Sequence, residues 1–147
     1  MFIRQNLLVA GVLALSLSLA QSAFARPVTD HLNRTVDVPE RIERVAVADI
    51  FPYASATCVY LGSCRKIVAM HPSSMAAAKN GLLKELYPEV TSVNTSVMKG
   101  AEVNLEALMG LKPDVVFVNA GNKRLIERLE SAGLPVSYTH LRAHETV

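Results

Sequence analysis

Apolar and polar positions divide the chain into an apolar N-terminal segment and a longer region of short, mixed elements. Leu7 to Ala20 is an uncharged run of Leu, Val, Ala, Gly and Ser, preceded by Arg4 and followed by an Ala-x-Ala arrangement that ends at Ala25. This order is typical of a secretory signal peptide. The apolar run of about 14 residues is shorter than the roughly 20 that span a bilayer, so we expect cleavage before Arg26 and not a membrane anchor.

Beyond Arg26 the pattern predicts short strands and helices in alternation. Apolar and polar residues alternate on both sides of a polar turn at Asn33, which predicts a small hairpin that ends at Pro39. The elements expected next are a buried strand over Arg44 to Ala48, a helix from Pro52 to Leu61 with Gly62 beyond it, and a strand over Ile67 to Met70. A helix over Met75 to Leu86, interrupted at Gly81 and stopped by Pro88, and a helix from Asn104 to Met109 should follow. The last expected elements are a strand over Val115 to Val118, a helix over Lys123 to Ala132 and a strand beginning at Leu134.

Strands that alternate with helices predict an α/β fold, a parallel sheet flanked by helices, over residues 26–136. Ser137 to Val147 is polar and lacks strand alternation, so we expect this tail not to be native sequence. Its His140 and His144 lie four apart and could share a helix face as metal ligands, but we favour an artefactual tail. The predicted organisation is therefore a signal peptide over 1–25, one α/β lobe over 26–136 and the tail over 137–147.

Charge and cysteine content narrow the function classes. The net charge is only +2, and removal of Arg4 with the signal peptide lowers it further, so neither nucleic acid nor an acidic membrane surface is an expected partner. No cysteine follows the apolar run where a lipoprotein would need one, so we expect a soluble product. Export leads to an oxidising compartment, where Cys58 and Cys64 could form a disulfide across a helix end or stay as buried thiols.

Three stretches, in this order and spacing, resemble one protein family. They are VTDHLNRTVDVPERIERVAV, LGSCRKIVAM and NLEALMGLKPDVVFV, which begin at Val28, Leu61 and Asn104. They are similar to the periplasmic substrate-binding proteins of ABC transporters for iron-siderophores, haem and cobalamin. The resemblance covers about Val28 to Val136.

The resemblance implies a two-lobed, monomeric binding protein without catalytic activity or cofactor, with a rigid helix between the lobes and the ligand in the cleft. It identifies this chain as the N-terminal lobe only. The implied partners are an ABC transporter permease in the membrane and a small-molecule metal chelate, above all an iron(III) siderophore, with haem, cobalamin and a nickel chelate as alternatives. In the family, the Glu of the Asn-Leu-Glu element pairs with permease arginines, which gives Glu106 a docking role, although a carboxylate in a first helical turn also has a purely structural use.

Candidate ligand-binding residues follow from the position of the strand ends. Ligands of open α/β sheets lie outside the carboxyl ends of the strands. Ferric chelates are bulky and often anionic, so a half-cleft should offer aromatic faces, hydrogen-bond donors and a cation. The candidates are Phe51, Tyr53, His71, Met75, Lys99, Asn119 and Asn122, each weighed against a simple packing or loop role.

Other functions receive less support from the sequence. A bare zinc or manganese carrier would need a compact set of His, Asp and Glu, and only His31 and His71 lie in the credible region. A small secreted α/β hydrolase would use Ser73, Ser74 or a cysteine as nucleophile, but no G-x-S-x-G motif is present. The composition leaves a structural or interaction module open.

Overall fold

The computed structural model describes residues 25–30, 33–99 and 102–139. Residues 1–24 of the predicted signal peptide, His31 and the histidine pair His140 and His144 lie outside the described residues. In the part of the chain that the structure describes, no helix is long and apolar enough to cross a membrane.

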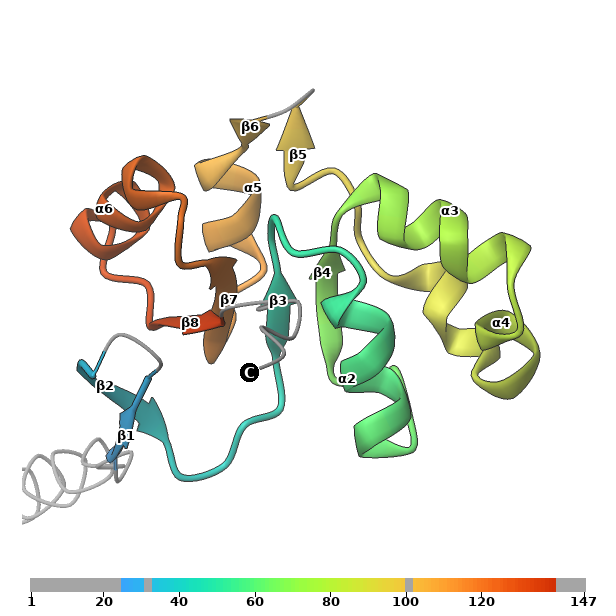
Figure 1. Ribbon diagram of the computed structural model, residues 1–147, viewed down its shortest axis with the longest axis horizontal. Coiled ribbons are helices and arrows are strands. Elements are labelled where there is room, and N and C mark those ends of the chain that lie inside the picture. The colour runs from blue at the N-terminus through green and yellow to red at the C-terminus, as the bar shows by residue number, and fades with distance from the viewer. Residues whose placement is uncertain (1–24, 31–32, 100–101, 140–147) are drawn as a thin grey trace, which may run out of the picture.

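A parallel four-stranded sheet forms the centre of the fold and confirms the predicted class (Figure 1). Its strands are β3 (Val45–Val47), β4 (Ile67–Met70), β7 (Val115–Asn119) and β8 (Val136–Thr139), in the spatial order β4-β3-β7-β8. Every neighbouring pair is parallel. All three residues of β3 are buried, as is usual for a parallel strand with elements on both of its faces.

Helices cover both faces of this sheet. One face carries α2 (Tyr53–Leu61), α3 (Pro72–Asn80), α4 (Leu83–Leu86) and a 3₁₀ turn over Pro88–Ser92. The other face carries α5 (Leu105–Gly110) and α6 (Lys123–Ser131). Two antiparallel hairpins complete the described fold: β1 (Ala25–Thr29) with β2 (Thr35–Pro39), and β5 (Met98–Lys99) with β6 (Glu102–Val103).

The alternation of strand side chains creates two separate cores. Val45 and Val47 point to the side of α2 and α3, whereas Ala46 points to the side of α5 and α6. On the second side, α6 buries Leu125 and Leu129 and leaves its charged residues exposed, which is the amphipathic pattern that the sequence indicated. The sheet therefore has a packed hydrophobic core on each of its two faces.

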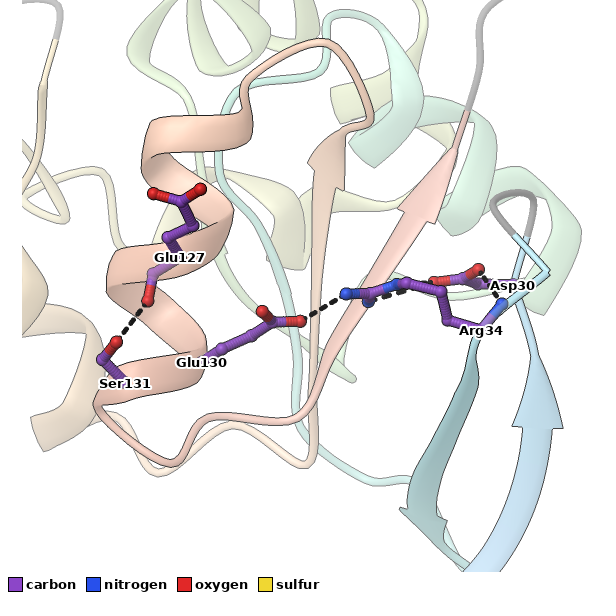
Figure 2. A network of polar contacts seen from close by, with 5 residues as sticks. All are labelled: Asp30, Arg34, Glu127, Glu130 and Ser131. Atoms are coloured by element: carbon purple, nitrogen blue, oxygen red, sulfur yellow. Dashed lines mark hydrogen bonds and ion pairs between the residues drawn. The ribbon is translucent and has the colours of Figure 1, made fainter.

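The hairpin β1–β2 lies beside the sheet: Val38 of β2 is buried in the core on the α2 side, and an ionic network joins the hairpin to α6 (Figure 2). The Arg34 guanidinium donates to Asp30 Oδ2 at 3.2 Å and to Glu130 Oε1 of α6 at 2.6 Å. Asp30 is 1% exposed in this pair, whereas Glu130 is largely open to solvent. The contact with the buried carboxylate is thus the energetically important one.

Two of the departures from the sequence predictions have a clear physical reason. The helix predicted from Met75 begins earlier, at Pro72, because His71 caps it and proline suits a first helical turn. The strand that begins near Val136 continues through Thr139, inside the segment predicted to be a non-native tail. Pairing with β7 is made by the backbone, so the polar residues there do not prevent a strand.

Candidate functional site

The carboxyl ends of β4, β3 and β7 lie at one edge of the sheet, because the three strands are neighbours and parallel. We call the loops that follow these ends the strand-end edge: residues 71–73, 49–52 and 119–122. Most of the candidate ligand-binding residues lie there. This is the edge where open α/β sheets hold ligands.

Asp49 joins two of these loops. Its Oδ1 accepts a hydrogen bond from the Asn119 backbone N–H at 2.8 Å, and its Oδ2 accepts one from Asn122 Nδ2 at 2.8 Å. The carboxylate therefore fixes the end of β7 against the end of β3. The sequence analysis missed Asp49 as a site residue, although an acid directly after a buried strand was a usable signal.

Asn119 and Asn122 are both exposed at the edge and organise the turn into α6. Asn119 Oδ1 accepts from the Gly121 N–H at 2.8 Å, and Asn122 Oδ1 accepts from the Leu125 N–H as the N-cap of α6. Within the described residues, the Asn119 side-chain NH₂ donates to no partner. It is the part of this pair that can still bind a ligand.

His71 is the N-cap of α3. Its Nδ1 accepts from the Ser73 backbone N–H at 3.0 Å, so a neutral ring carries its proton on Nε2. The Nε2–H group is thus the donor that His71 can offer. Pro72 can be the first residue of the helix because the backbone N–H at that position has no partner within the helix.

The apolar candidates Phe51, Tyr53 and Met75 differ in their exposure, and their role in ligand binding stays a prediction. Tyr53 turns inward and packs on Phe117, with ring centroids 5.0 Å apart, and this burial raises the pKa of its hydroxyl. Met75 is 7% exposed and belongs to the core beside α3. Phe51, which is 51% exposed, is the candidate that keeps an open aromatic face. Tyr53 faces Phe117 because it is the first residue of α2 and helical periodicity turns this position toward the sheet.

Two cations lie near this edge. A hollow of about 190 Å³ is lined by Asp49, Asn122, Glu102, Arg124 and Arg128. Two exposed arginines of α6 therefore lie close to Asp49 and Asn122. Sequence reasoning missed both arginines, because only the packing of α6 against β6 places them there. Lys99, the predicted cation, is exposed in the separate hairpin β5–β6.

Glu106 lies in the first turn of α5 and is exposed. Asn104 Oδ1 caps this helix by accepting from the Ala107 N–H at 3.2 Å. Among the described residues the Glu106 carboxylate forms no hydrogen bond or ion pair. The structural role that remains for Glu106 is a favourable interaction of its negative charge with the dipole of α5.

Cys58 and Cys64 are joined by a disulfide that links α2 to the loop before β4, with Cα atoms 4.6 Å apart. Both sulfurs are buried. Glu89 supports the same loop, since its carboxylate accepts from Ser63 Oγ and the Cys64 N–H. Its own backbone N–H, then these two donors, hold the pKa of Glu89 below its usual range. In the part of the chain that the structure describes, no three His, Cys, Asp or Glu side chains are placed to hold a metal ion.

No protein-family model matches the sequence. The molybdate-binding protein MolA of Haemophilus influenzae is 33% identical over 145 aligned residues, and the match covers 96% of this chain and 39% of MolA. The chain therefore spans about two fifths of the length of this curated relative.

Solved structures show the same similarity. A periplasmic solute-binding protein of Veillonella parvula superposes with a TM-score of 0.73 at 30% identity, over 78% of this chain and 35% of that protein. MolA of H. influenzae bound to molybdate gives 0.64 at 29% identity, over 82% and 36%. The haem-binding protein HmuT gives 0.61 at 23% identity, over 82% and 36%, and supports the fold alone.

Proposed function

Because this chain is a homologue of the periplasmic solute-binding proteins of ABC transporters and spans about two fifths of the relative MolA, we propose that it forms one wall of a ligand cleft. In the complete protein this wall captures a small solute in the periplasm and delivers it to a membrane permease. The protein acts as a monomeric carrier without a catalytic step. The strand-end edge is the wall in question.

The chemistry of this edge supports a compact, anionic ligand. It offers hydrogen-bond donors on Asn119 and His71, with Phe51 as the one candidate that keeps an open aromatic face. The neighbouring hollow adds two arginines, which lie beside the carboxylates of Asp49 and Glu102. Such a set suits an oxyanion better than a bulky chelate. MolA, at 33% identity, is a molybdate-binding protein, which supports a tetrahedral oxyanion of this kind.

An iron(III) chelate is the second candidate. Phe51 is 51% exposed and gives an aromatic face on which a siderophore or a haem could pack, with Lys99 as a cation for its acidic groups. Cobalamin and nickel chelates belong to the same class of bulky ligand.

A hybrid protein tests the proposal: this chain through Thr139, joined to the portion of MolA that lies outside the match. Isothermal titration with molybdate, tungstate, sulfate, a ferric siderophore, haem, cobalamin and a nickel chelate should show binding of molybdate or tungstate. Binding of a chelate but of no oxyanion would make the second candidate correct. A folded hybrid that binds none of them, while MolA binds molybdate, would contradict the capture of a solute. Hydrolase assays of the same protein should show no activity.

A pair of variants tests the two arginines. In the hybrid, Arg124→Gln should weaken oxyanion binding about ten- to hundredfold, because one charge-assisted hydrogen bond is lost. Lys123→Gln is the matched control, since this cation lies on the same helix but does not line the hollow. Equal effects of the two variants would show that only the overall charge matters.

A further inference from the structure

The corner between α3 and α4 carries the one Asn-Gly dipeptide of the sequence, Asn80–Gly81. Asn80 is the last residue of α3 and Gly81 is its C-cap, and both are exposed. Gly81 leaves the helical conformation, with φ −109° and ψ −171°, and so ends the helix. This corner lies at the opposite end of α3 from His71 and the strand-end edge (Figure 1).

The backbone nitrogen of Gly81 is open to reaction. The N–H groups at the C-caps of α2 and α6, on Gly62 and Ala132, donate to helix carbonyls, whereas the Gly81 N–H donates to no partner within the described residues. Glycine has no Cβ that would shield this nitrogen. A Cβ at Gly81 would lie 3.0 Å from the Ala77 carbonyl oxygen, so any larger residue here would crowd the helix backbone.

The Asn80 side chain is free to approach this nitrogen. It forms no hydrogen bond in the part of the chain that the structure describes. Four other asparagines have their Oδ1 held by a backbone N–H close by: Asn94, Asn104, Asn119 and Asn122. Those bonds hold the four side chains away from the nitrogen of the following residue, and Asn80 has no such constraint.

We propose that Asn80 deamidates spontaneously in the folded protein, with water as the co-reactant. The Gly81 nitrogen loses its proton to a base in the solvent and attacks Cγ of Asn80. The N–Cγ bond forms, the Cγ–Nδ2 bond breaks, and Nδ2 leaves as ammonia after taking up a proton. Water then opens the cyclic imide at either carbonyl group, which gives aspartate or isoaspartate without any change of oxidation state.

The fold should protect this dipeptide little. In the interior of a helix the N–H of the following residue is bonded and the backbone is fixed, whereas helix ends fray with an opening free energy near zero. Deamidation therefore does not need the unfolding of α3, whose Met75 and Ala78 are buried in the core. The product places a negative charge at the C-terminal end of the helix, where the helix dipole disfavours it.

Peptide mass spectrometry tests the proposal on the 147-residue chain, first shown to be folded by a cooperative thermal transition. During incubation in warm, mildly alkaline buffer, the tryptic peptide 80–84 should gain the mass difference between OH and NH₂. Its rate of conversion in the folded chain should lie within about threefold of the rate in urea, because the helix end opens without global unfolding. The peptide 85–99, which contains Asn94, is the control and should stay unchanged in the same digest of the folded chain.

Asn80→Gln is the matched variant, because its side chain is longer by a methylene and would need a larger, less favourable ring. It should keep the Tm and show no gain of mass. After incubation the unmodified chain should melt about 2 °C lower, because of the new charge at the helix end, and the variant should not. A slower conversion in the folded chain than the threefold margin allows would overturn the proposal, since the helix end would then be closed. So would equal conversion of Asn94, because a held side chain would then be as reactive as the free one.

Discussion

At the scale of single residues, Asp49 shows how one carboxylate organises the site. It accepts hydrogen bonds from the backbone of Asn119 and the side chain of Asn122 and thereby joins the loops after β3 and β7. Asp49 thus positions the edge, and the unused donors of Asn119 and His71 remain for a ligand. Glu106, by contrast, has its carboxylate free of described partners, as a docking group requires.

Replacement of Glu106 should separate capture of the ligand from its delivery. In the hybrid, Glu106→Gln should leave ligand affinity unchanged and weaken docking to the permease by about 2 kcal/mol, roughly thirtyfold, because one charge-assisted contact is lost. Transport assays in cells that carry the MolA transporter would measure this. Glu127→Gln, an exposed glutamate on α6, is the control. Normal uptake by a folded Glu106 variant would show that this residue only stabilises the start of α5 and does not dock to the permease.

Glu89 should make part of the stability depend on pH. Its pKa is lowered in the folded state, so its contribution is present at neutral pH and is lost as the pH falls through that folded pKa. Glu89→Gln should therefore lower Tm at neutral pH, and the gap to the unmodified protein should narrow between about pH 6 and pH 3. Thermal scans across this range check the prediction. A gap that stays constant would mean that the charge of Glu89 is irrelevant.

At the scale of secondary-structure elements, a disulfide and an ionic network join segments that the hydrogen bonds of the sheet do not connect. The disulfide fastens the end of α2 to the loop before β4, and the Arg34 network fastens the hairpin β1–β2 to α6. Both lie away from the strand-end edge. We therefore expect their loss to affect stability more than ligand binding.

Removal of the disulfide should lower the free energy of unfolding. Its cysteines are separated by 6 positions, and a loop this short gives about 2 kcal/mol from the reduced entropy of the unfolded chain. Cys58→Ala combined with Cys64→Ala should show this loss in urea denaturation. The control is dithiothreitol, which should destabilise the unmodified protein and leave the double variant unchanged. An unmodified protein that does not respond to reduction would argue against the bond.

The Arg34 network should depend far more on its buried half than on its exposed half. Arg34→Met removes the cation from the buried Asp30 carboxylate and should cost about 3 kcal/mol, as broken buried pairs do. Glu130→Gln loses an exposed contact and should cost less than about 1 kcal/mol. Chemical denaturation of both variants measures the difference. Equal costs would show that the hairpin is held chiefly through α6.

At the scale of the whole molecule, the N-terminal part of the fold is compatible with the predicted processing. Cleavage before Arg26 would remove Ala25 from β1 and keep the pairing of Arg26 with Val38 through Thr29 with Thr35. Mass spectrometry of periplasmic material should find Arg26 as the first residue. Material that retains Met1 to Ala25 would contradict the signal peptide.

The sequence by itself determined the elements and their class. Periodicity, caps and glycines located α2, α5, α6 and the central strands within a residue or two, because these signals act between near neighbours in the chain. Gly62 and Gly133, which lie just beyond α2 and α6, have the positive φ that is common for glycine after a helix. The loops of the strand-end edge followed from the general rule for parallel sheets.

Only the tertiary structure decided which side chains face outward and which elements meet. Tyr53 packs against Phe117 and is half-buried, Asp49 links two loops, and α6 brings Arg124 and Arg128 beside Asp49. These features are contacts between residues far apart in the chain, and no local pattern of apolar and polar positions specifies them.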